Sequence, residues 1–256
     1  MMNSLKGLRV LNTRPLTQGK SLSQAINAAG GIAIDCPALS IEPTDISWLK
    51  TLPDLHQVDK AIFISGNAVE YCFTALEKTQ LLWPPTIQVI AVGQATAMAL
   101  QQHQIEVSFV PQIANSEHLL ELGVLQQIKH ETILLFKGED GRPLIADTLI
   151  ARGANLLIFN VYKRLMPIAN SEQIHSLWHN RAVDIILFTS QQAINNTFLL
   201  FGDDKQAWLR SIPCIVISER LAKEAALLGM QTIIISSPET ILNKLHEFNQ
   251  GLIDGQ

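Results

Sequence analysis

Residues 62–69, Ile-Phe-Ile-Ser-Gly-Asn-Ala-Val, pass from an apolar run through a polar turn into a helical pattern. The segment at residues 187–194, Leu-Phe-Thr-Ser-Gln-Gln-Ala-Ile, repeats this arrangement 125 positions later. A buried strand, a short turn and an amphipathic helix in that order are typical of a parallel α/β unit. Because the arrangement occurs twice, the sequence predicts two similar α/β units.

The rest of the chain continues the same alternation of short apolar runs and longer amphipathic stretches. The expected strands are residues 9–12, 31–35, 60–65, 88–92, 106–110, 132–136, 155–162, 184–190, 214–218 and 232–236. The expected helices are residues 18–29, 67–77, 96–102, 116–127, 144–152, 191–201, 220–228 and 238–248. Strands that are apolar almost throughout belong to parallel sheets with helices on both faces. The predicted fold class is therefore α/β with parallel sheets, and a cleft between two such units is a favoured ligand site.

Composition limits the class of protein. The chain has 256 residues, of which 47% are hydrophobic and 16% are charged, with a net charge of −4. This excludes a disordered protein and argues against a broad nucleic-acid-binding face. The longest apolar runs are strand-sized, so no membrane span is expected, and the first residues carry no secretory pattern. The odd number of cysteines, Cys36, Cys72 and Cys214, predicts buried free thiols in a reducing compartment, which indicates a cytoplasmic protein.

Several turns that follow a strand and open a helix are candidate anion sites, because such turns present backbone N–H groups and the positive end of a helix dipole. The residues proposed to bind an anionic ligand there are Ser65, Gly66, Thr96, Gly138, Arg142, Ser190, Gln191 and Ser218. Arg14, which follows the first strand, adds a further positive charge. The alternative is that the serines and threonine are ordinary helix caps and the arginines ordinary surface residues.

Two other groups of residues each allow either a chemical or a purely structural interpretation. Tyr162, beside Lys163 and Arg164, ends a strand, and its phenol could donate a proton or simply pack in a core. His175 and His179 are four residues apart on an expected helix, which allows a metal pair but is more typical of a solvated helix face. The sequence has no dinucleotide-binding, Walker, nucleophile-elbow or Cys-x-x-Cys motif, so nothing in it supports a nucleotide-dependent reaction.

The motifs, taken in order, resemble the uroporphyrinogen-III synthase family over nearly the whole chain. The matching segments are Val10-Leu11-Asn12-Thr13-Arg14-Pro15, Phe63-Ile64-Ser65-Gly66-Asn67-Ala68-Val69, Ala91-Val92-Gly93-Gln94-Ala95-Thr96-Ala97, Gly138-Glu139-Asp140-Gly141-Arg142, Arg152-Gly153-Ala154, Val161-Tyr162-Lys163-Arg164, Phe188-Thr189-Ser190 and Val216-Ile217-Ser218-Glu219-Arg220. The family resemblance rests on their order and spacing, since each motif alone is common.

The resemblance implies two flavodoxin-like α/β domains, one inserted in the other and joined by a two-stranded linker. The expected domains are residues 1–37 with 168–256, and residues 43–161, with linker strands at 38–42 and 162–167. The sequence repeat by itself would instead divide the chain near residue 129 into two consecutive halves.

The resemblance also implies an activity. Members of the family close hydroxymethylbilane, a linear tetrapyrrole with eight carboxylates, into a macrocycle with loss of water and inversion of the last ring, through an azafulvene and a spiro intermediate and without a metal or organic cofactor. Carried over to this sequence, Tyr162 assists loss of the hydroxyl, and Thr96, Ser65 and Ser190 face the substrate. The second unit departs from the first at Ser218, where no threonine follows.

Further expectations are a monomeric, cytoplasmic enzyme and transient contact with the preceding enzyme of the pathway. Two other functions stay open at this point. One is a non-catalytic two-domain module that binds anions, and the other is a metal-dependent enzyme that uses His175 and His179. A synthase gives the type III isomer of the tetrapyrrole product, whereas a binding module leaves only the spontaneous type I isomer. A metal-dependent enzyme would carry bound metal after purification.

Overall fold

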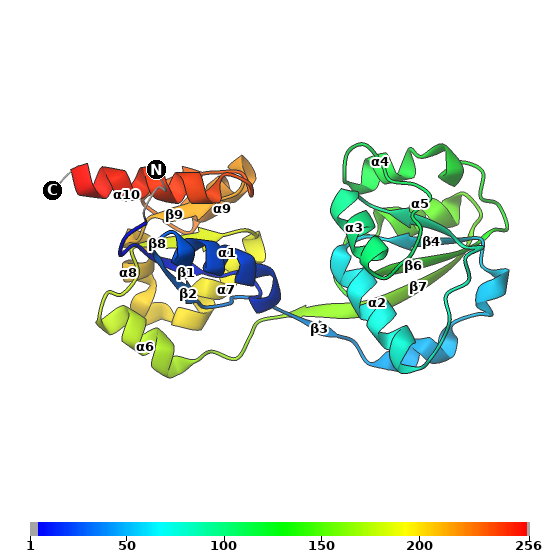
Figure 1. Cartoon of the computed structure of the whole chain (residues 1–256), viewed down its shortest axis with the longest axis horizontal. Helices are drawn as coiled ribbons and strands as arrows, with labels where there is room; N and C mark the ends of the chain where they lie inside the picture. The colour runs from blue at the N-terminus through cyan, green and yellow to red at the C-terminus, as the bar shows by residue number, and fades with distance from the viewer. Residues whose placement is uncertain (1–4, 255–256) are drawn as a thin grey trace. The chain divides into compact units, whose positions relative to one another are not determined.

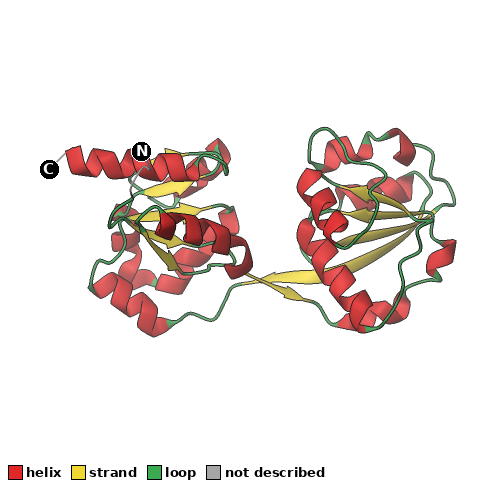
Figure 2. Ribbon diagram, in the orientation of Figure 1, coloured by secondary structure: helices red, strands yellow, loops and turns green. Residues whose placement is uncertain are grey.

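The computed structural model describes residues 5–254 and contains two compact units. Unit 1 comprises residues up to Ser40 together with those from Leu165 onward, and unit 2 is the segment Ile41–Arg164. Each unit is built around one five-stranded sheet between helices (Figures 1 and 2). The linker strands expected at 38–42 and 162–167 stay a prediction.

Unit 1 has a parallel sheet with the strand order β10-β9-β8-β1-β2. Its strands are β1 (Arg9–Asn12), β2 (Ile32–Asp35), β8 (Ile185–Phe188), β9 (Cys214–Val216) and β10 (Ile233–Ile235). Its helices are α1 (Leu16–Ala28), α6 (Ser171–His179), α7 (Gln191–Phe201), α8 (Gln206–Ser211), α9 (Glu219–Leu227) and α10 (Ile241–Asp254), with a 3-10 turn at Asp203–Lys205. Numbered within the unit, this is the 2-1-3-4-5 order of flavodoxin-like folds.

Unit 2 has the strand order β3-β7-β6-β4-β5, in which β5, β4, β6 and β7 are parallel. Its strands are β3 (Ser40–Pro43), β4 (Lys60–Phe63), β5 (Gln88–Ala91), β6 (Thr132–Gly138) and β7 (Asn155–Leu165). Its helices are α2 (Gly66–Lys78), α3 (Gln94–Gln102), α4 (Ser116–Leu120) and α5 (Leu144–Ala151), with 3-10 turns at Ile46–Thr51, Leu55–Gln57 and Gly123–Leu125. The four parallel strands again follow the 2-1-3-4 order.

Alternate residues of each central strand face opposite layers of helices. In unit 2, Phe63 and Phe136 pack under α2 and α3, whereas Ile62 and Leu135 pack under α4 and α5. In unit 1, Phe188 joins α6, α7 and α9 on one face, and Leu187 joins α1 and α10 on the other. The central strands are therefore buried on both sides, and the predicted α/β class with parallel sheets is confirmed.

Two expected elements differ from the structure. Residues 106–110 do not form a strand but make one isolated bridge between Phe109 and Ile90. The hydroxyl of Ser108 accepts the Val89 N–H in place of a backbone carbonyl, which interrupts the ladder at this edge. The helix expected at 116–127 ends at Leu120.

The early end of α4 is stabilised by side chains. Gln126 donates to the carbonyls of Leu120 and Leu122, and Arg152 donates to those of Leu120 and Leu125. These contacts satisfy carbonyls that a continuing helix would have paired.

The start of β1 is fixed to the start of β8 by an ion pair. Asp184 accepts hydrogen bonds from the Arg9 backbone N–H at 2.8 Å and from Arg9 Nε at 3.0 Å. Burial alone would raise the pKa of the Asp184 carboxyl, but the Arg9 hydrogen bonds outweigh it and hold that pKa below its ordinary value. The pair therefore stabilises unit 1 in the ionised state of Asp184.

We expect Asp184→Asn to lower the free energy of unfolding by about 1–2 kcal/mol at neutral pH. A carboxyl with a depressed folded-state pKa stabilises above its unfolded pKa of about 3.9, and the contribution disappears as the pH falls through the folded value. Chemical denaturation at pH 7 and pH 3 measures the difference. The exposed Glu172→Gln is the control, and an Asp184→Asn deficit that is equally large at pH 3 would contradict the assignment.

Candidate active site

Both sheets have a topological switch point, where neighbouring strands are connected in opposite directions. In unit 2 it lies between β4 and β6, and in unit 1 between β1 and β8. Ligands of open α/β sheets bind outside the carboxyl ends of the strands at this point. The sequence repeat pairs the same strands, β4 with β8 and β6 with β1, so it places equivalent turns at the two switch points.

The side chain of Tyr162 reaches the switch point of unit 2 from the next strand. Tyr162 on β7 is in register with Gly138 at the end of β6. A Cβ atom on Gly138 would lie 2.7 Å from the Tyr162 ring, so the ring lies where a side chain at 138 would be. The phenol oxygen thereby reaches across β6 to Ser65, which follows β4, at an O–O distance of 3.2 Å.

Three further contacts hold the Tyr162 ring. Tyr71 stacks on it at a centroid distance of 6.2 Å and donates its own hydroxyl to the Ile41 carbonyl. Arg164 lies over the ring and donates from Nη2 to the phenol oxygen at 3.3 Å. Tyr162 is only 2% exposed, so its hydroxyl is held in a defined position.

Ser65 has two roles at this edge. It is the N-cap of α2, where its hydroxyl accepts the Ala68 N–H at 3.1 Å, and it donates to Tyr162. Gly66 is the first residue of α2, where helix N–H groups have no partner within the helix. The structure therefore brings Ser65, Gly66, Gly138 and Tyr162 together, with the N-terminus of α2 beside them.

The other predicted residues of unit 2 have different surroundings. Thr96 lies in the first turn of α3, after β5, and is 4% exposed, so its side chain is enclosed. The Arg142 side chain is 74% exposed and pairs with Glu117 at 3.0 Å. A substrate role for these two residues stays a prediction.

In unit 1, Arg14 follows β1 at the switch point. The turn that carries it is fixed by Thr13, whose hydroxyl donates to the Leu187 carbonyl at 2.6 Å, and by Asn12, which accepts the Arg14 N–H. The Arg14 side chain is half-buried, and desolvation lowers the pKa of its guanidinium. Among residues 5–254 it forms no ion pair, and its role as a ligand for an anion stays a prediction.

Ser190, Gln191 and Ser218 lie at the same edge of unit 1. Ser190 caps α7 by accepting the Ala193 N–H at 3.1 Å, the same contact that Ser65 makes in unit 2. Ser218 caps α9, and Gln191 accepts a hydrogen bond from Arg220. Because β9, β8 and β1 are neighbours, these residues and Arg14 share one sheet edge. The serines are caps, as the structural interpretation expected, and their binding role stays a prediction.

Sequence reasoning did not assign a role to Arg164, Tyr71 or Arg220. Arg164 had a usable signal, since residues i and i+2 of a strand face the same side and Arg164 stands two residues after Tyr162. Tyr71 and Arg220 had none, because their contacts depend on how helices pack in the folded unit.

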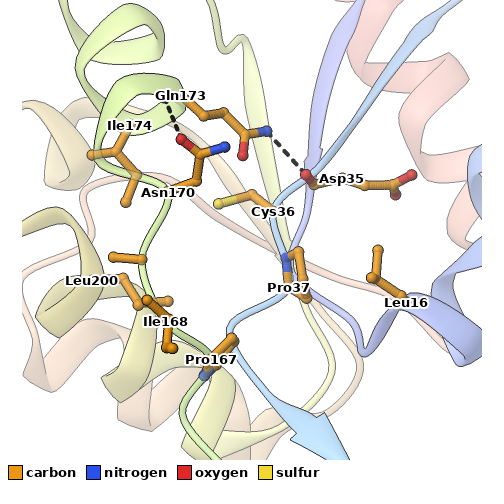
Figure 3. Close-up of a pocket in the computed structure, with 11 residues that line it drawn as sticks. Leu16, Asp35, Cys36, Pro37, Pro167, Ile168, Asn170, Gln173, Ile174 and Leu200 are labelled. Carbon is orange, nitrogen blue, oxygen red and sulfur yellow. Dashed lines mark hydrogen bonds between the residues drawn. The ribbon is translucent and has the colours of Figure 1, made fainter.

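Unit 1 also contains an apolar pocket of about 270 Å³ that none of the predicted residues lines. Figure 3 shows Cys36, Ile168, Ile174 and Leu200 around it, with Gln173 donating to the main-chain oxygen of Asp35. Burial raises the pKa of the Cys36 thiol to about 11. The Cys36 thiol therefore stays protonated at neutral pH.

The described residues give no support to the metal-dependent alternative, and the cysteines have the state predicted for them. All three cysteines are free and buried, as predicted, and burial also raises the pKa of Cys214, to about 12. His175 and His179 stack with a ring distance of 5.8 Å, but within residues 5–254 no group of three or more His, Cys, Asp or Glu is placed to hold a metal ion. No helix in this range is long and apolar enough to span a membrane.

Comparison with known proteins finds a matching family model and curated relatives with the same name. The family model described as uroporphyrinogen-III synthase HemD matches residues 20–242. The uroporphyrinogen-III synthase of Escherichia coli K12 is 31% identical over 235 residues, which cover 90% of this chain and 95% of that protein. The Proteus mirabilis enzyme is 35% identical over 182 residues, covering 70% of this chain and 92% of its own.

Solved structures support the fold. A crystal structure of a mutant uroporphyrinogen III synthase from Thermus thermophilus matches with a TM-score of 0.65 at 18% identity, covering 97% of this chain and all of that one. The Helicobacter pylori enzyme matches with a TM-score of 0.60 at 18% identity, covering 96% and 99%. Together with the matched family model and the curated relatives, this shows that the chain belongs to the uroporphyrinogen-III synthase family.

Proposed function

We propose that this protein closes hydroxymethylbilane to uroporphyrinogen III, with Tyr162 as the proton donor to the departing hydroxyl. Membership of the family gives the reaction, and one observation carries the assignment of the acid. The Tyr162 hydroxyl lies at the switch point of unit 2, held by Ser65 across a strand that has a glycine at the crossing. The metal-dependent alternative has no comparable arrangement among residues 5–254.

The proposed step balances without a cofactor. As the C–O bond of the hydroxymethyl group breaks, the bonding electrons leave with the oxygen and the phenol supplies a proton, so water departs and an N-protonated azafulvene cation remains opposite the Tyr162 phenolate. The substituted carbon of the last ring attacks this cation, and the spiro intermediate rearranges with inversion of that ring. The proton released when the pyrrole regains aromaticity returns to the Tyr162 phenolate, so the net change is the loss of one water.

The substrate carries eight negative charges, whereas the protein carries a net charge of −4. Attraction by the protein as a whole therefore cannot bind it, and local donors have to. The proposed donors are the backbone N–H groups at the N-termini of α2 and α7, together with Arg14. Much of the catalysis then lies in holding a flexible chain in the geometry that closes the ring.

The product isomer tests the function directly. Freshly prepared hydroxymethylbilane closes spontaneously to the type I ring, so we expect the purified protein to give mainly the type III isomer on chromatographic analysis. Heat-inactivated protein is the control and should give type I alone. If the intact protein also gave only type I, the protein would be a binding module rather than a synthase.

We expect Tyr162→Phe to lower turnover by roughly 10²-fold or more, because it removes the proton donor and keeps the ring. A second variant tests the same assignment by steric means. Gly138→Ala places a methyl group 2.7 Å from the Tyr162 ring and should displace it, so turnover should fall in parallel. Gly123→Ala is the matched control, since a Cβ there meets nothing within 4 Å.

Rates are measured on folded protein, verified by circular dichroism. Unchanged turnover in Tyr162→Phe would remove the phenol from the mechanism while leaving the family membership intact.

A further inference from the structure

Arg164 is placed to act on Tyr162 from the same strand. It stands two residues beyond Tyr162 on β7, and its guanidinium carbon lies 5.5 Å from the centre of the Tyr162 ring. Its Nη2 donates to the phenol oxygen at 3.3 Å. The guanidinium therefore contacts both the ring and the hydroxyl of the proposed proton donor.

The phenol oxygen receives two hydrogen bonds, one from Ser65 and one from Arg164. A phenol has one hydrogen to donate and lone pairs to accept. With the accepting positions occupied, the phenol hydrogen points away from both donors, and among residues 5–254 no acceptor is assigned to it. The two donors thus leave the phenol hydrogen free for an acceptor on a bound ligand.

Arg164 also has N–H groups that are not used on Tyr162. A guanidinium has five N–H groups in a planar fork, and one of them is used on Tyr162. Within the described part of the chain Arg164 forms no ion pair, and its side chain is half-exposed whereas Tyr162 is buried. A ligand arriving from solvent therefore meets the guanidinium, and the remaining N–H groups can bind a carboxylate in bidentate fashion.

We propose that Arg164 is a positioning residue for the ring closure. It binds a carboxylate of the pyrrole that bears the hydroxymethyl group and, through its contact with the phenol, sets that hydroxyl against the Tyr162 proton. This inference rests on the proposed function, and it adds a residue that acts through Tyr162 rather than on the reacting atoms.

The test is a double-mutant cycle with Arg164→Met and Tyr162→Phe, measured as kcat and KM on hydroxymethylbilane. Arg164→Met alone should lower kcat by about tenfold and raise KM, because both the contact with the phenol and the carboxylate contact are lost. In the Tyr162→Phe background it should change kcat by less than about twofold and still raise KM. Arg164→Lys should keep KM nearer the wild-type value, since the charge remains, with kcat still reduced.

Lys163→Met is the matched control. It removes the same charge from the neighbouring residue, whose side chain points to the other side of the strand, and should leave kcat within about twofold. An equal loss of kcat from Arg164→Met in both backgrounds would overturn the inference, as would wild-type kinetics or a loss matched by Lys163→Met. If Arg164→Met does not fold, Arg164→Lys carries the cycle.

The product isomer formed by the wild-type protein shows whether a negative result concerns only the role of Arg164 or the proposed function as a whole. A wild-type protein that forms only the type I ring would refute the proposed function. One that forms type III, with no coupling between residues 164 and 162, would refute only the role of Arg164.

Discussion

The close approach of the Tyr162 ring to Gly138 is the contact on which the proposed chemistry depends. Any larger residue at 138 would fill the space that the ring occupies, since a Cβ atom alone would lie 2.7 Å from it. With glycine there, a side chain from β7 crosses β6 and reaches the residue that caps the helix after β4. The phenol thus shares one edge with the N-terminus of α2, so the proposed acid lies beside the proposed anion-binding groups.

The proposed binding of a polyanion by a protein with a negative net charge depends on how its charges are distributed. Arg9 forms an ion pair with Asp184, and Arg142 forms one with Glu117. Arg14 and Arg164 form no ion pair in the described part of the chain, and each lies at the carboxyl end of a strand beside its unit's switch point. A partly desolvated cation such as Arg14 binds carboxylates more strongly than a fully solvated one.

The fold was largely predictable from the sequence because buried parallel strands and amphipathic helices leave strong periodic patterns. The pattern around Ser65 recurs around Ser190, and both serines make the same cap in the structure. The edge segment at 106–110 has the composition of a strand, but its pairing is broken by the Ser108 side chain, which no periodicity reveals.

The site was less predictable than the fold. Strand-end turns can be read from the sequence, and the position of Tyr162 on its strand can be read as well, whereas its role stays a prediction. The crossing over Gly138 could not, because it depends on the register between β6 and β7, which a local pattern does not fix. Arg142 has a sequence context like that of Arg14, but it pairs with Glu117 of α4, a contact between distant segments that no local pattern predicts.

A crystal structure of the protein with bound uroporphyrinogen III would test the central claim most directly. In unit 2, we expect product carboxylates to accept hydrogen bonds from backbone N–H groups in the turn after β4, with the newly formed bridge carbon beside the Tyr162 hydroxyl. Product bound only elsewhere, for example in the apolar pocket around Cys36, with the turn after β4 empty, would contradict the central claim.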